Sequence, residues 1–290
     1  MRVIDSHVHL YPPEVGHDPA GWAMAHGEPQ WAGLTTRLRK NGTGVQTFPT
    51  VDQLLREMDE AGVERAVLLG WYWHNGDTCV HQNRFYAGCI RAHPDRLSAF
   101  ATVQPLAGGA VTADEMRRAH GDGLIGLGEL SPHAQRFAID LPAFRAALVL
   151  AGELGWSVNL HVTDPNSRPF PGRVETPLED FIRLALDFPF VNFILAHWGG
   201  LLPLRESAAL ALPNLHYDTS ASPLLYDDSV WRRFLATVPA ERVLFGSDFP
   251  LNNYPKLDAS PVMSRFVAEA KQAGCPELVL RQNAERLLRL

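Results

Sequence analysis

The chain begins with Val3-Ile4-Asp5-Ser6-His7-Val8-His9-Leu10, a short segment in which apolar residues alternate with polar ones. Side chains of a β-strand point alternately to its two faces, so this segment predicts a strand with Asp5, His7 and His9 on one face. Seven further short segments rich in apolar and β-branched residues follow it along the chain. The eight predicted strands are 3–10, 66–73, 97–104, 124–130, 157–162, 191–197, 215–219 and 242–247.

Amphipathic segments typical of helices separate these strands, for example 51–62, 141–155 and 177–189, and each of the three ends at Gly or Pro. The last segment, 276–290, predicts a closing amphipathic helix. Regular alternation of strand and helix predicts parallel strands joined by right-handed crossovers. Eight such units in 290 residues match the size of a closed (β/α)8 TIM barrel. We therefore expect one α/β domain over 1–290, with a doubly wound open sheet as the alternative.

One long segment, 11–49, lacks both helical and strand periodicity and is rich in Gly, Pro, Trp and His. It follows the first strand, so in a barrel it would lie over the catalytic end. It is predicted to be a long loop that acts as a lid or pocket wall, and a surface insertion is the alternative.

The composition is that of a soluble globular protein, with 46% apolar and 20% charged residues. The charge of 26 − 32 = −6 provides no basic surface for nucleic acid or an anionic membrane. No apolar segment approaches the roughly 18 residues of a membrane span, and the N-terminus does not resemble a signal peptide. The 3 cysteines form no CxxC pair, so a disulfide framework is not expected. These features predict a cytoplasmic protein that acts on a small molecule.

Metal-ligating side chains lie at the ends of several predicted strands. His7 and His9 are near the end of the first strand, and three more such residues follow at the ends of the fifth, sixth and eighth: His161, His197 and Asp248. The carboxyl ends of barrel strands meet at one face, where active sites are built. Imidazole and carboxylate groups are the ligands that zinc takes in catalytic sites. The pattern predicts a metal site, although each residue alone is as well explained by a structural hydrogen bond.

The same residues lie in motifs that resemble the amidohydrolase superfamily. The motifs are DSHVHL at 5–10, LHV at 160–162, LAHWGG at 195–200, FGSDFP at 245–250 and NAERLL at 283–288. They are most similar to the amidohydrolase-related branch, which includes aminocarboxymuconate semialdehyde decarboxylase and related decarboxylases and hydrolases. The resemblance extends from Ile4 to Leu290. It implies a TIM barrel, and it suggests that such barrels pair as homodimers.

The resemblance also implies roles for individual residues. Four of them would contact one divalent metal, most often zinc: His7, His9, His161 and Asp248. His197 would be a catalytic histidine near the metal-bound water. Many superfamily members carry a carbamylated lysine on the fourth strand, where this chain has Glu129. A glutamate there is similar to the TatD-like deoxyribonuclease branch and implies a second ion, whereas the alternative is a carboxylate that orients a ligand histidine.

A metal ion held in this way lowers the pKa of its bound water toward about 7. Asp248 is then expected to act as general base, while His197 polarises the substrate oxygen or donates a proton. We predict a metal-dependent hydrolase of a small amide, ester or lactone, with a non-oxidative decarboxylase of a small unsaturated or aromatic acid as the alternative. A two-metal TatD-like phosphodiesterase and a non-catalytic barrel are the further alternatives.

Residues after the strand ends are candidates for the substrate pocket. Those singled out for substrate binding are Trp73, His133, Arg168 and Trp198. Trp71, Tyr72 and His74 beside Trp73 are further candidates, because aromatic walls with an arginine suit a planar carboxylate. Asp218 on the seventh strand is expected either to orient a metal ligand or to form an internal hydrogen bond.

Overall fold

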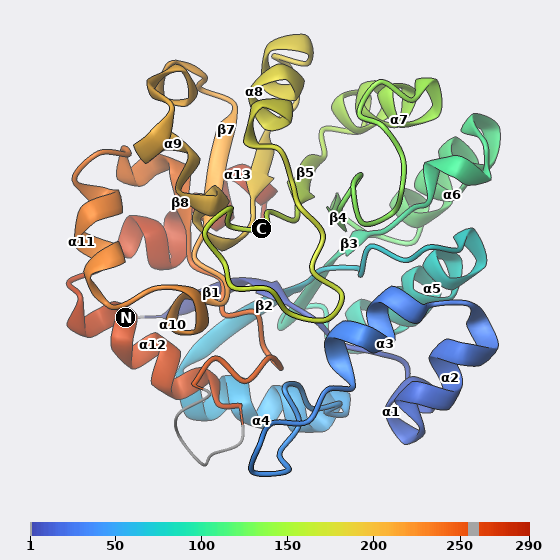
Figure 1. Ribbon diagram of the computed structural model, residues 1–290, viewed down its shortest axis with the longest axis horizontal. Helices are drawn as coiled ribbons and strands as arrows, with labels where there is room; N and C mark the ends of the chain where they lie inside the picture. Colours follow the sequence, from blue (N-terminus) through green and yellow to red (C-terminus); the bar gives the residue numbers. More distant parts are fainter. Residues whose placement is uncertain (1, 255–260) are drawn as a thin grey trace.

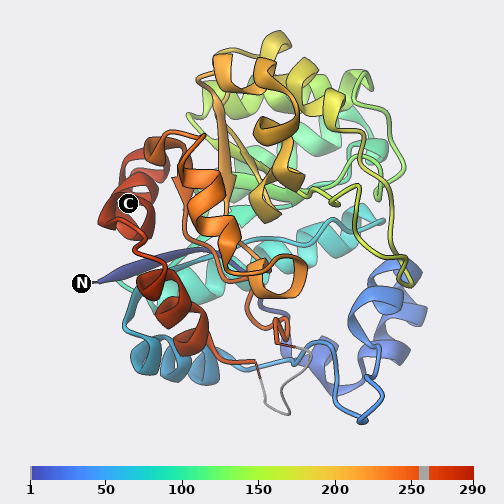
Figure 2. The ribbon, with the colours of Figure 1, turned by 60° about the vertical axis from the view of Figure 1, so that its left-hand side comes forward.

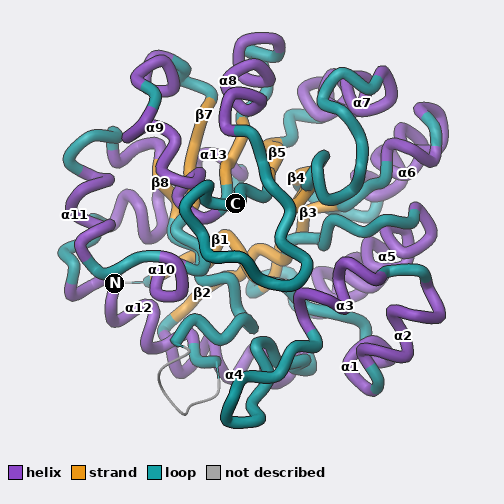
Figure 3. Tube along the Cα trace, viewed as in Figure 1, coloured by secondary structure: helices purple, strands orange, loops and turns teal. Residues whose placement is uncertain are grey.

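The structure is a computed structural model that describes residues 2–254 and 261–290. Met1 and 255–260, which belong to the predicted domain 1–290, lie outside the described residues. Eight parallel strands are hydrogen-bonded in chain order from β1 to β8. Helices surround them (Figures 1 and 3). The predicted (β/α)8 TIM barrel is confirmed, and the doubly wound sheet is excluded.

The strands are short and nearly all of their residues are buried, as expected for parallel strands covered on both faces. They are β1 Val3–Val8, β2 Val63–Leu68, β3 Leu97–Ala101, β4 Gly126–Leu130, β5 Ser157–Leu160, β6 Phe193–Leu195, β7 Leu215–Asp218 and β8 Val243–Leu244. The barrel closes through the segment after β8, where Asp248 N donates to His7 O at 2.9 Å and His9 N donates to Phe249 O at 2.7 Å. This closure brings β1 and Asp248 side by side.

The outer layer consists of helices that follow the strands (Figure 1). They are α4 Val51–Ala61, α5 Gly76–Ala92, α6 Gly109–Gly121, α7 Pro142–Glu153, α8 Leu178–Asp187, α9 Leu202–Arg205, α10 Ser222–Leu225, α11 Ser229–Leu235, α12 Met263–Gln272 and α13 Asn283–Leu288. The predicted helices 51–62, 141–155 and 177–189 are confirmed by α4, α7 and α8. The closing segment 276–290 is less regular than predicted, because a π-helical turn, Leu278–Gln282, precedes α13.

The segment 11–49 differs from the predicted loop because it contains three short helices. They are α1 Pro13–His17, α2 Pro19–His26 and α3 Pro29–Thr35. Each begins with a proline at its first position, where a backbone N–H would have no partner within the helix. None exceeds 8 residues, so helical periodicity could not develop in the sequence. Each helix is held by one or two buried side chains, such as Trp22 and Trp31, which pack in an aromatic cluster.

The segment 161–177 after β5 passes in front of the strands in Figure 1 and reaches α3 (Figure 2). Gln30 Nε2 donates to Gly172 O at 3.3 Å, and the Arg37 guanidinium lies 5.3 Å from the Phe170 ring centre. The segment 161–177 therefore contacts the helical part of 11–49, and the role of 11–49 as a lid stays a prediction. No helix in the described part of the chain is long and apolar enough to cross a membrane.

Candidate metal centre

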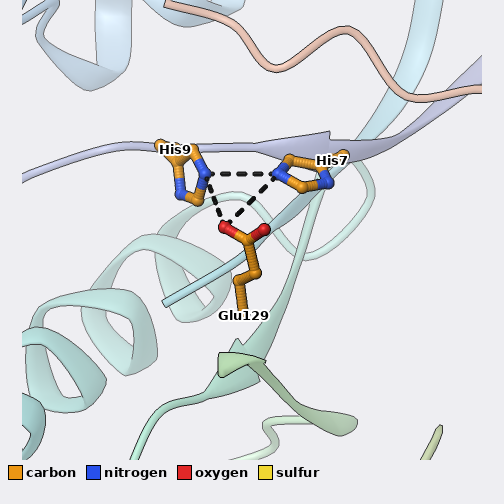
Figure 4. A group of neighbouring side chains, drawn as sticks. All are labelled: His7, His9 and Glu129. Carbon is orange, nitrogen blue, oxygen red and sulfur yellow. Dashed lines mark hydrogen bonds and ion pairs between the residues drawn. The ribbon is translucent and has the colours of Figure 1, made fainter. Parts of the chain in front are cut away.

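His7 of β1 and His9, which directly follows β1, are directed toward each other and toward Glu129 of β4 (Figure 4). The two Nε2 atoms are 3.2 Å apart, and Glu129 Oε2 lies 3.5 Å from that of His9 and 3.9 Å from that of His7. Asp248 approaches from the segment after β8, with Oδ1 at 3.5 Å and 3.8 Å from the same two nitrogens. All four side chains are buried. Two imidazoles and two carboxylates thus converge.

The other carboxylate oxygen of Glu129 faces a second pair of histidines. His161 Nδ1 lies 3.0 Å from Glu129 Oε1, and His197 Nε2 lies 3.8 Å from the same oxygen. The two ring nitrogens are 3.3 Å apart. Glu129 therefore belongs to two groups that could each hold an ion, one with His7 and His9 and one with His161 and His197.

The hydrogen bonds of His7 and His9 determine which ring nitrogen of each residue is free to bind an ion. His9 Nδ1 lies 3.1 Å from the carbonyl oxygen of Leu69, which can only accept a hydrogen bond. His7 Nδ1 lies 2.9 Å from Asp218 Oδ2. Both Nδ1 atoms therefore carry the proton, and both Nε2 atoms present a lone pair to the cluster.

When His7 and His9 are neutral, their Nε2 lone pairs therefore face the carboxylate oxygens of Glu129 and Asp248. Such an arrangement favours a cation. Burial opposes a charge on His7, but the carboxylates of Asp218, Glu129 and Asp248 outweigh it and raise the pKa of this imidazole to about 10. A positive charge at this position is thus stabilised by its surroundings. This donor set fits a divalent metal ion.

Asp218 of β7 holds His7 in place. Its two oxygens accept hydrogen bonds from His7 Nδ1, Asn159 Nδ2, the backbone N–H groups of His197 and Ser220, and the Ser220 hydroxyl. Burial raises the pKa of this carboxyl group, but the interaction with His7 outweighs burial and holds the pKa below its ordinary value. Asp218 therefore forms internal hydrogen bonds and also orients the His7 ring.

The backbone is strained or crowded where the site is built. His197 has φ of 59° and Asp248 has φ of 63°, in the left-handed region that residues with a Cβ seldom adopt. Gly246 passes so close to β1 that a Cβ at this position would lie 2.7 Å from His7 Cβ. Glycine is therefore required there for the close approach of the two strands.

An aromatic wall covers both halves of the cluster. The Trp71 ring lies 5.2 Å from the His9 ring, and the Tyr72 ring lies 4.9 Å from the His161 ring. The two aromatic rings stack at 4.4 Å. His161 is the most exposed member of the cluster, at 20% of its side chain, so its side of the cluster faces the mouth of the barrel.

The four residues predicted to bind substrate have the following surroundings, and their role in binding stays a prediction. Trp73 lies in the layer behind Trp71, with its Nε1 donating to Gln82 at 2.5 Å. Arg168 is exposed in the segment 161–177. His133 Nε2 lies 2.8 Å from Asp180.

Trp198 is directed into the packing between barrel and helices. Its ring lies 4.9 Å from that of Trp231 and 4.8 Å from that of Phe234, both on α11, and its Nε1 donates to the Ser222 hydroxyl. Asn159 and Tyr11 were not predicted as site residues from the sequence, although Tyr11 lies only two residues after His9.

A profile described as Amidohydrolase matches residues 4–290. The chain belongs to this amidohydrolase family, which confirms the resemblance noted in its motifs. A search of the curated proteins finds no match.

Among solved structures, the chain is similar over its full length to 5-carboxyvanillate decarboxylase from Sphingomonas paucimobilis, with a TM-score of 0.77, 18% identity and 99% of that chain covered. The corresponding enzyme from Novosphingobium aromaticivorans, complexed with manganese and 4-hydroxy-3-methoxy-5-nitrobenzoic acid, has a TM-score of 0.74 and 15% identity, with 100% of this chain and 96% of that one covered. A probable 2-pyrone-4,6-dicarboxylic acid hydrolase from Acinetobacter baumannii has a TM-score of 0.64 and 17% identity, with both chains fully covered. At these identities the likeness establishes the fold.

Proposed function

We propose that the protein is a metal-dependent decarboxylase of a planar unsaturated or aromatic carboxylic acid. The observation that carries this proposal is the wall of Trp71 and Tyr72, which contacts a histidine in each half of the cluster. Stacked indole and phenol rings bind a flat conjugated substrate well and a flexible aliphatic one poorly. The similarity in fold to two decarboxylases of aromatic acids supports the same choice. This interpretation is preferred over the hydrolase expected from the sequence.

His7, His9 and Asp248 would hold one divalent ion together with Glu129. The second half of the cluster, with His161 and His197, provides a place for another ion that shares Glu129. Nitrogen and carboxylate donors suit Zn²⁺ and also Mn²⁺. A metal ion held there would supply Lewis acidity to polarise an oxygen of the substrate.

Asp248 is the proposed proton carrier, because it is adjacent to the cluster and adopts a strained conformation at its edge. Its carboxylate would take the proton of a ring hydroxyl on the substrate and return it to the ring carbon that bears the carboxylate. The bond from that carbon to the carboxylate then breaks, its electron pair returns to the ring and carbon dioxide leaves. The product oxygen finally takes a proton from solvent, so one proton is consumed for each carbon dioxide released.

From the sequence, His197 is predicted to polarise the substrate oxygen or to donate a proton. Its Nδ1 lies 2.9 Å from Ser220 Oγ, whose hydrogen is directed to Asp218, and 3.2 Å from the carbonyl oxygen of Ser220. Both contacts favour the tautomer with the proton on Nδ1 and a lone pair on Nε2. Burial also lowers the pKa of His197, which keeps the imidazole neutral. We therefore assign His197 as a ligand or proton acceptor on the Glu129 side of the cluster.

A hydrolase of an amide, ester or lactone is the second candidate, and one observation favours it. Glu129 lies between two pairs of histidines, which is the arrangement expected of two metal ions that share a bridging ligand. Two such ions would supply an activated water for attack on a carbonyl carbon.

The two candidates differ in the product that they release. Metal-loaded protein would be incubated in water enriched in ¹⁸O with hydroxybenzoic acids labelled with ¹³C at the carboxylate, and separately with aryl esters and lactones. The proposal predicts labelled carbon dioxide and no ¹⁸O in the aromatic product. Asp248→Asn should remove this activity, whereas Asp187→Asn, which alters an ion pair with Arg145 on the outer surface, should keep it. Incorporation of ¹⁸O without release of carbon dioxide would favour the hydrolase.

A further inference from the structure

The candidate metal centre is almost closed to solvent. Most of the cluster and both rings of the aromatic wall are more than nine-tenths buried: His7, His9, Glu129, His197, Asp248, Trp71 and Tyr72. His161 is the exception, with 20% of its side chain exposed. A molecule that is to lie against the wall or reach the cluster must therefore displace part of the protein.

The loop that follows β5 has two ends that lie together. We call its residues 165–175 the strap. On either side of the strap, Thr163 N donates to Thr176 Oγ1 at 2.9 Å, and the Thr176 hydroxyl donates to Thr163 O at 3.2 Å. Asp164 also accepts a hydrogen bond from the hydroxyl of Tyr226. The ends of the strap are thus fixed to the barrel independently of its tip.

Hydrogen bonds within the strap hold it in shape. Ser167 N donates to Asp164 O at 2.9 Å, and Arg173 N donates to Phe170 O at 3.1 Å. The Arg173 guanidinium also donates through Nε to Ser167 Oγ at 3.0 Å. A compact loop with its ends together can turn about them as one unit, because these hydrogen bonds need not break.

The tip of the strap rests on α3 and on the residues that follow α3. Gln30 Nε2 donates to Gly172 O at 3.3 Å, which is long for such a hydrogen bond. The ring of Phe170 contacts the partly exposed Arg37 guanidinium at 5.3 Å. The Gly172 backbone lies so close to α3 that a Cβ on it would be 2.8 Å from Leu34 Cγ. Close packing at one glycine and two weak polar contacts therefore hold the tip.

These tip contacts complete a ring of contacts around the aromatic wall. Trp31 of α3 lies 5.4 Å from the Tyr11 ring, which lies 6.4 Å from the Trp71 ring. Trp71 stacks on Tyr72, and Tyr72 lies 4.9 Å from His161, at the start of the loop that carries the strap. The ring of contacts thus runs from His161 through the wall to α3 and returns along the strap. Release of the tip would break it.

An open groove separates the strap from α8 and α9. Its volume is about 640 Å³. Pro165, Arg173 and Glu175 of the strap line one side, and residues such as Ile182 of α8 and Arg205 of α9 line the other. A strap that leaves α3 therefore has space to turn into without displacing a helix.

We propose that the strap is a gate to the metal centre. In the closed position, which the structure shows, Gly172 is docked on α3. In the open position the strap has turned into the groove toward α8 and α9, with hinges at Thr163 and Thr176, and the wall of Trp71 and Tyr72 is accessible. The gate governs access to the cluster, whichever reaction the cluster performs.

The reaction of individual histidines with diethyl pyrocarbonate measures this access in metal-free protein. Mass spectrometry gives the rate at each residue. His9 and His197 are buried in the cluster, whereas His81 on α5 has 47% of its side chain exposed and serves as the internal reference. Gly172→Ala should release the tip. Relative to His81, the buried pair should then react about tenfold faster, which corresponds to about 1.4 kcal/mol.

Gly42→Ala is the matched control. Gly42 has φ of 82°, close to the 79° of Gly172, but a Cβ on it would meet no atom within 4 Å. The two variants therefore share the backbone strain, and Gly172→Ala alone disturbs the docking. Gly42→Ala should leave the rates at His9 and His197 within about twofold of wild type.

Two further variants test the docking and the direction of opening. Phe170→Ala removes the ring that contacts Arg37, so it should also speed the reaction of the buried pair, and it provides a second test if Gly172→Ala does not fold. Glu179→Trp places a large side chain in the groove from α8 and should slow the same reaction. Unchanged rates in Glu179→Trp would overturn the proposed direction.

The gate itself is overturned if both undocking variants react like wild type, or if Gly42→Ala is accelerated as much as Gly172→Ala. The proposed function is tested separately by release of carbon dioxide. Gated histidines in a protein that decarboxylates no acid would refute the decarboxylase and support the gate. Decarboxylation by a protein whose buried histidines react independently of the strap would do the reverse.

Discussion

Asp218→Asn should weaken metal binding although Asp218 itself is not proposed as a ligand. Oδ1 of Asp218 accepts from the backbone N–H groups of His197 and Ser220, so the amide oxygen of asparagine is expected to take that place. The NH₂ group would then face His7 Nδ1, where Oδ2 now accepts at 2.9 Å. Two donors cannot share this contact. His7 is forced to carry its proton on Nε2, which removes the lone pair from the metal centre.

The size of the expected loss in metal affinity follows from the hydrogen bond between Asp218 and His7 that the substitution removes. A hydrogen bond to a charged group is worth about 1.5–3 kcal/mol, and partners that orient metal-bound histidines account for about 10–100-fold in affinity. We therefore expect Zn²⁺ or Mn²⁺ to bind Asp218→Asn about 10–100-fold more weakly than wild type. Competition with a fluorescent chelator measures this directly.

Asp5→Asn is the matched control, because Asp5 is also a fully buried carboxylate of the barrel. Its Oδ1 accepts from the backbone N–H groups of His7 and Ser247, and its Oδ2 has no partner. The amide can keep both hydrogen bonds and does not face an imidazole. Metal affinity should change by less than about threefold in this variant. Equal affinities of Asp218→Asn and wild type would refute the tautomer that we assign to His7.

Three further predictions follow from individual contacts. Glu129→Gln removes the carboxylate shared by the two halves of the cluster, so protein purified without chelator should lose at least one ion per chain by mass spectrometry; an unchanged metal content would exclude Glu129 as a ligand. Gly246→Ala places a Cβ 2.7 Å from His7 Cβ and should lower the free energy of unfolding by about 1–3 kcal/mol in denaturant titrations, whereas Gly88→Ala meets no atom within 4 Å and should not lower it. Burial, aided by nearby arginines, lowers the pKa of His216 to about 3, so the unfolded chain binds the extra proton below pH 6.5 and stability falls as the pH falls. Between pH 7.5 and 4.5, His216→Gln should lose about 2–3 kcal/mol less stability than wild type, and equal losses would contradict this assignment.

The fold was predictable because its signals are local. Each strand is a short apolar segment, and the helices between them carry one apolar face and end at Gly or Pro, as α4 does at Gly62. The short helices of 11–49 could not be predicted from such local patterns. They have at most 8 residues, and their stability comes from contacts of Trp22 and Trp31 with residues distant in sequence.

The sequence predicts that the side chains of the candidate metal centre converge, but not how they contact one another, and their role as metal ligands stays a prediction. His7 and His9 share a face through simple alternation, Glu129 lies in β4, and His161, His197 and Asp248 follow the ends of β5, β6 and β8. The tautomers of His7 and His9 depend on Asp218 and Leu69, which only the tertiary structure brings to them. The position of Glu129 between two pairs of histidines likewise requires the closed barrel.

The aromatic residues show most clearly why sequence position alone was insufficient. Trp198 follows His197 directly, but it lies in a run of left-handed residues over 197–201, and its ring packs in the helical layer. After β2, in contrast, the chain directs Trp71 and Tyr72 to the metal centre and Trp73 behind them. Such differences arise from backbone dihedral angles that the residue types do not specify.

The most direct test of the proposed decarboxylase is incorporation of deuterium. Metal-loaded wild type and Asp248→Asn would be incubated in D₂O with a panel of hydroxybenzoic acids, and the products examined by NMR and mass spectrometry. The account predicts one deuterium at the carbon that carried the carboxylate, one carbon dioxide released per product, and loss of both in Asp248→Asn. Turnover that leaves every carboxylate in place and adds water to another bond would contradict it.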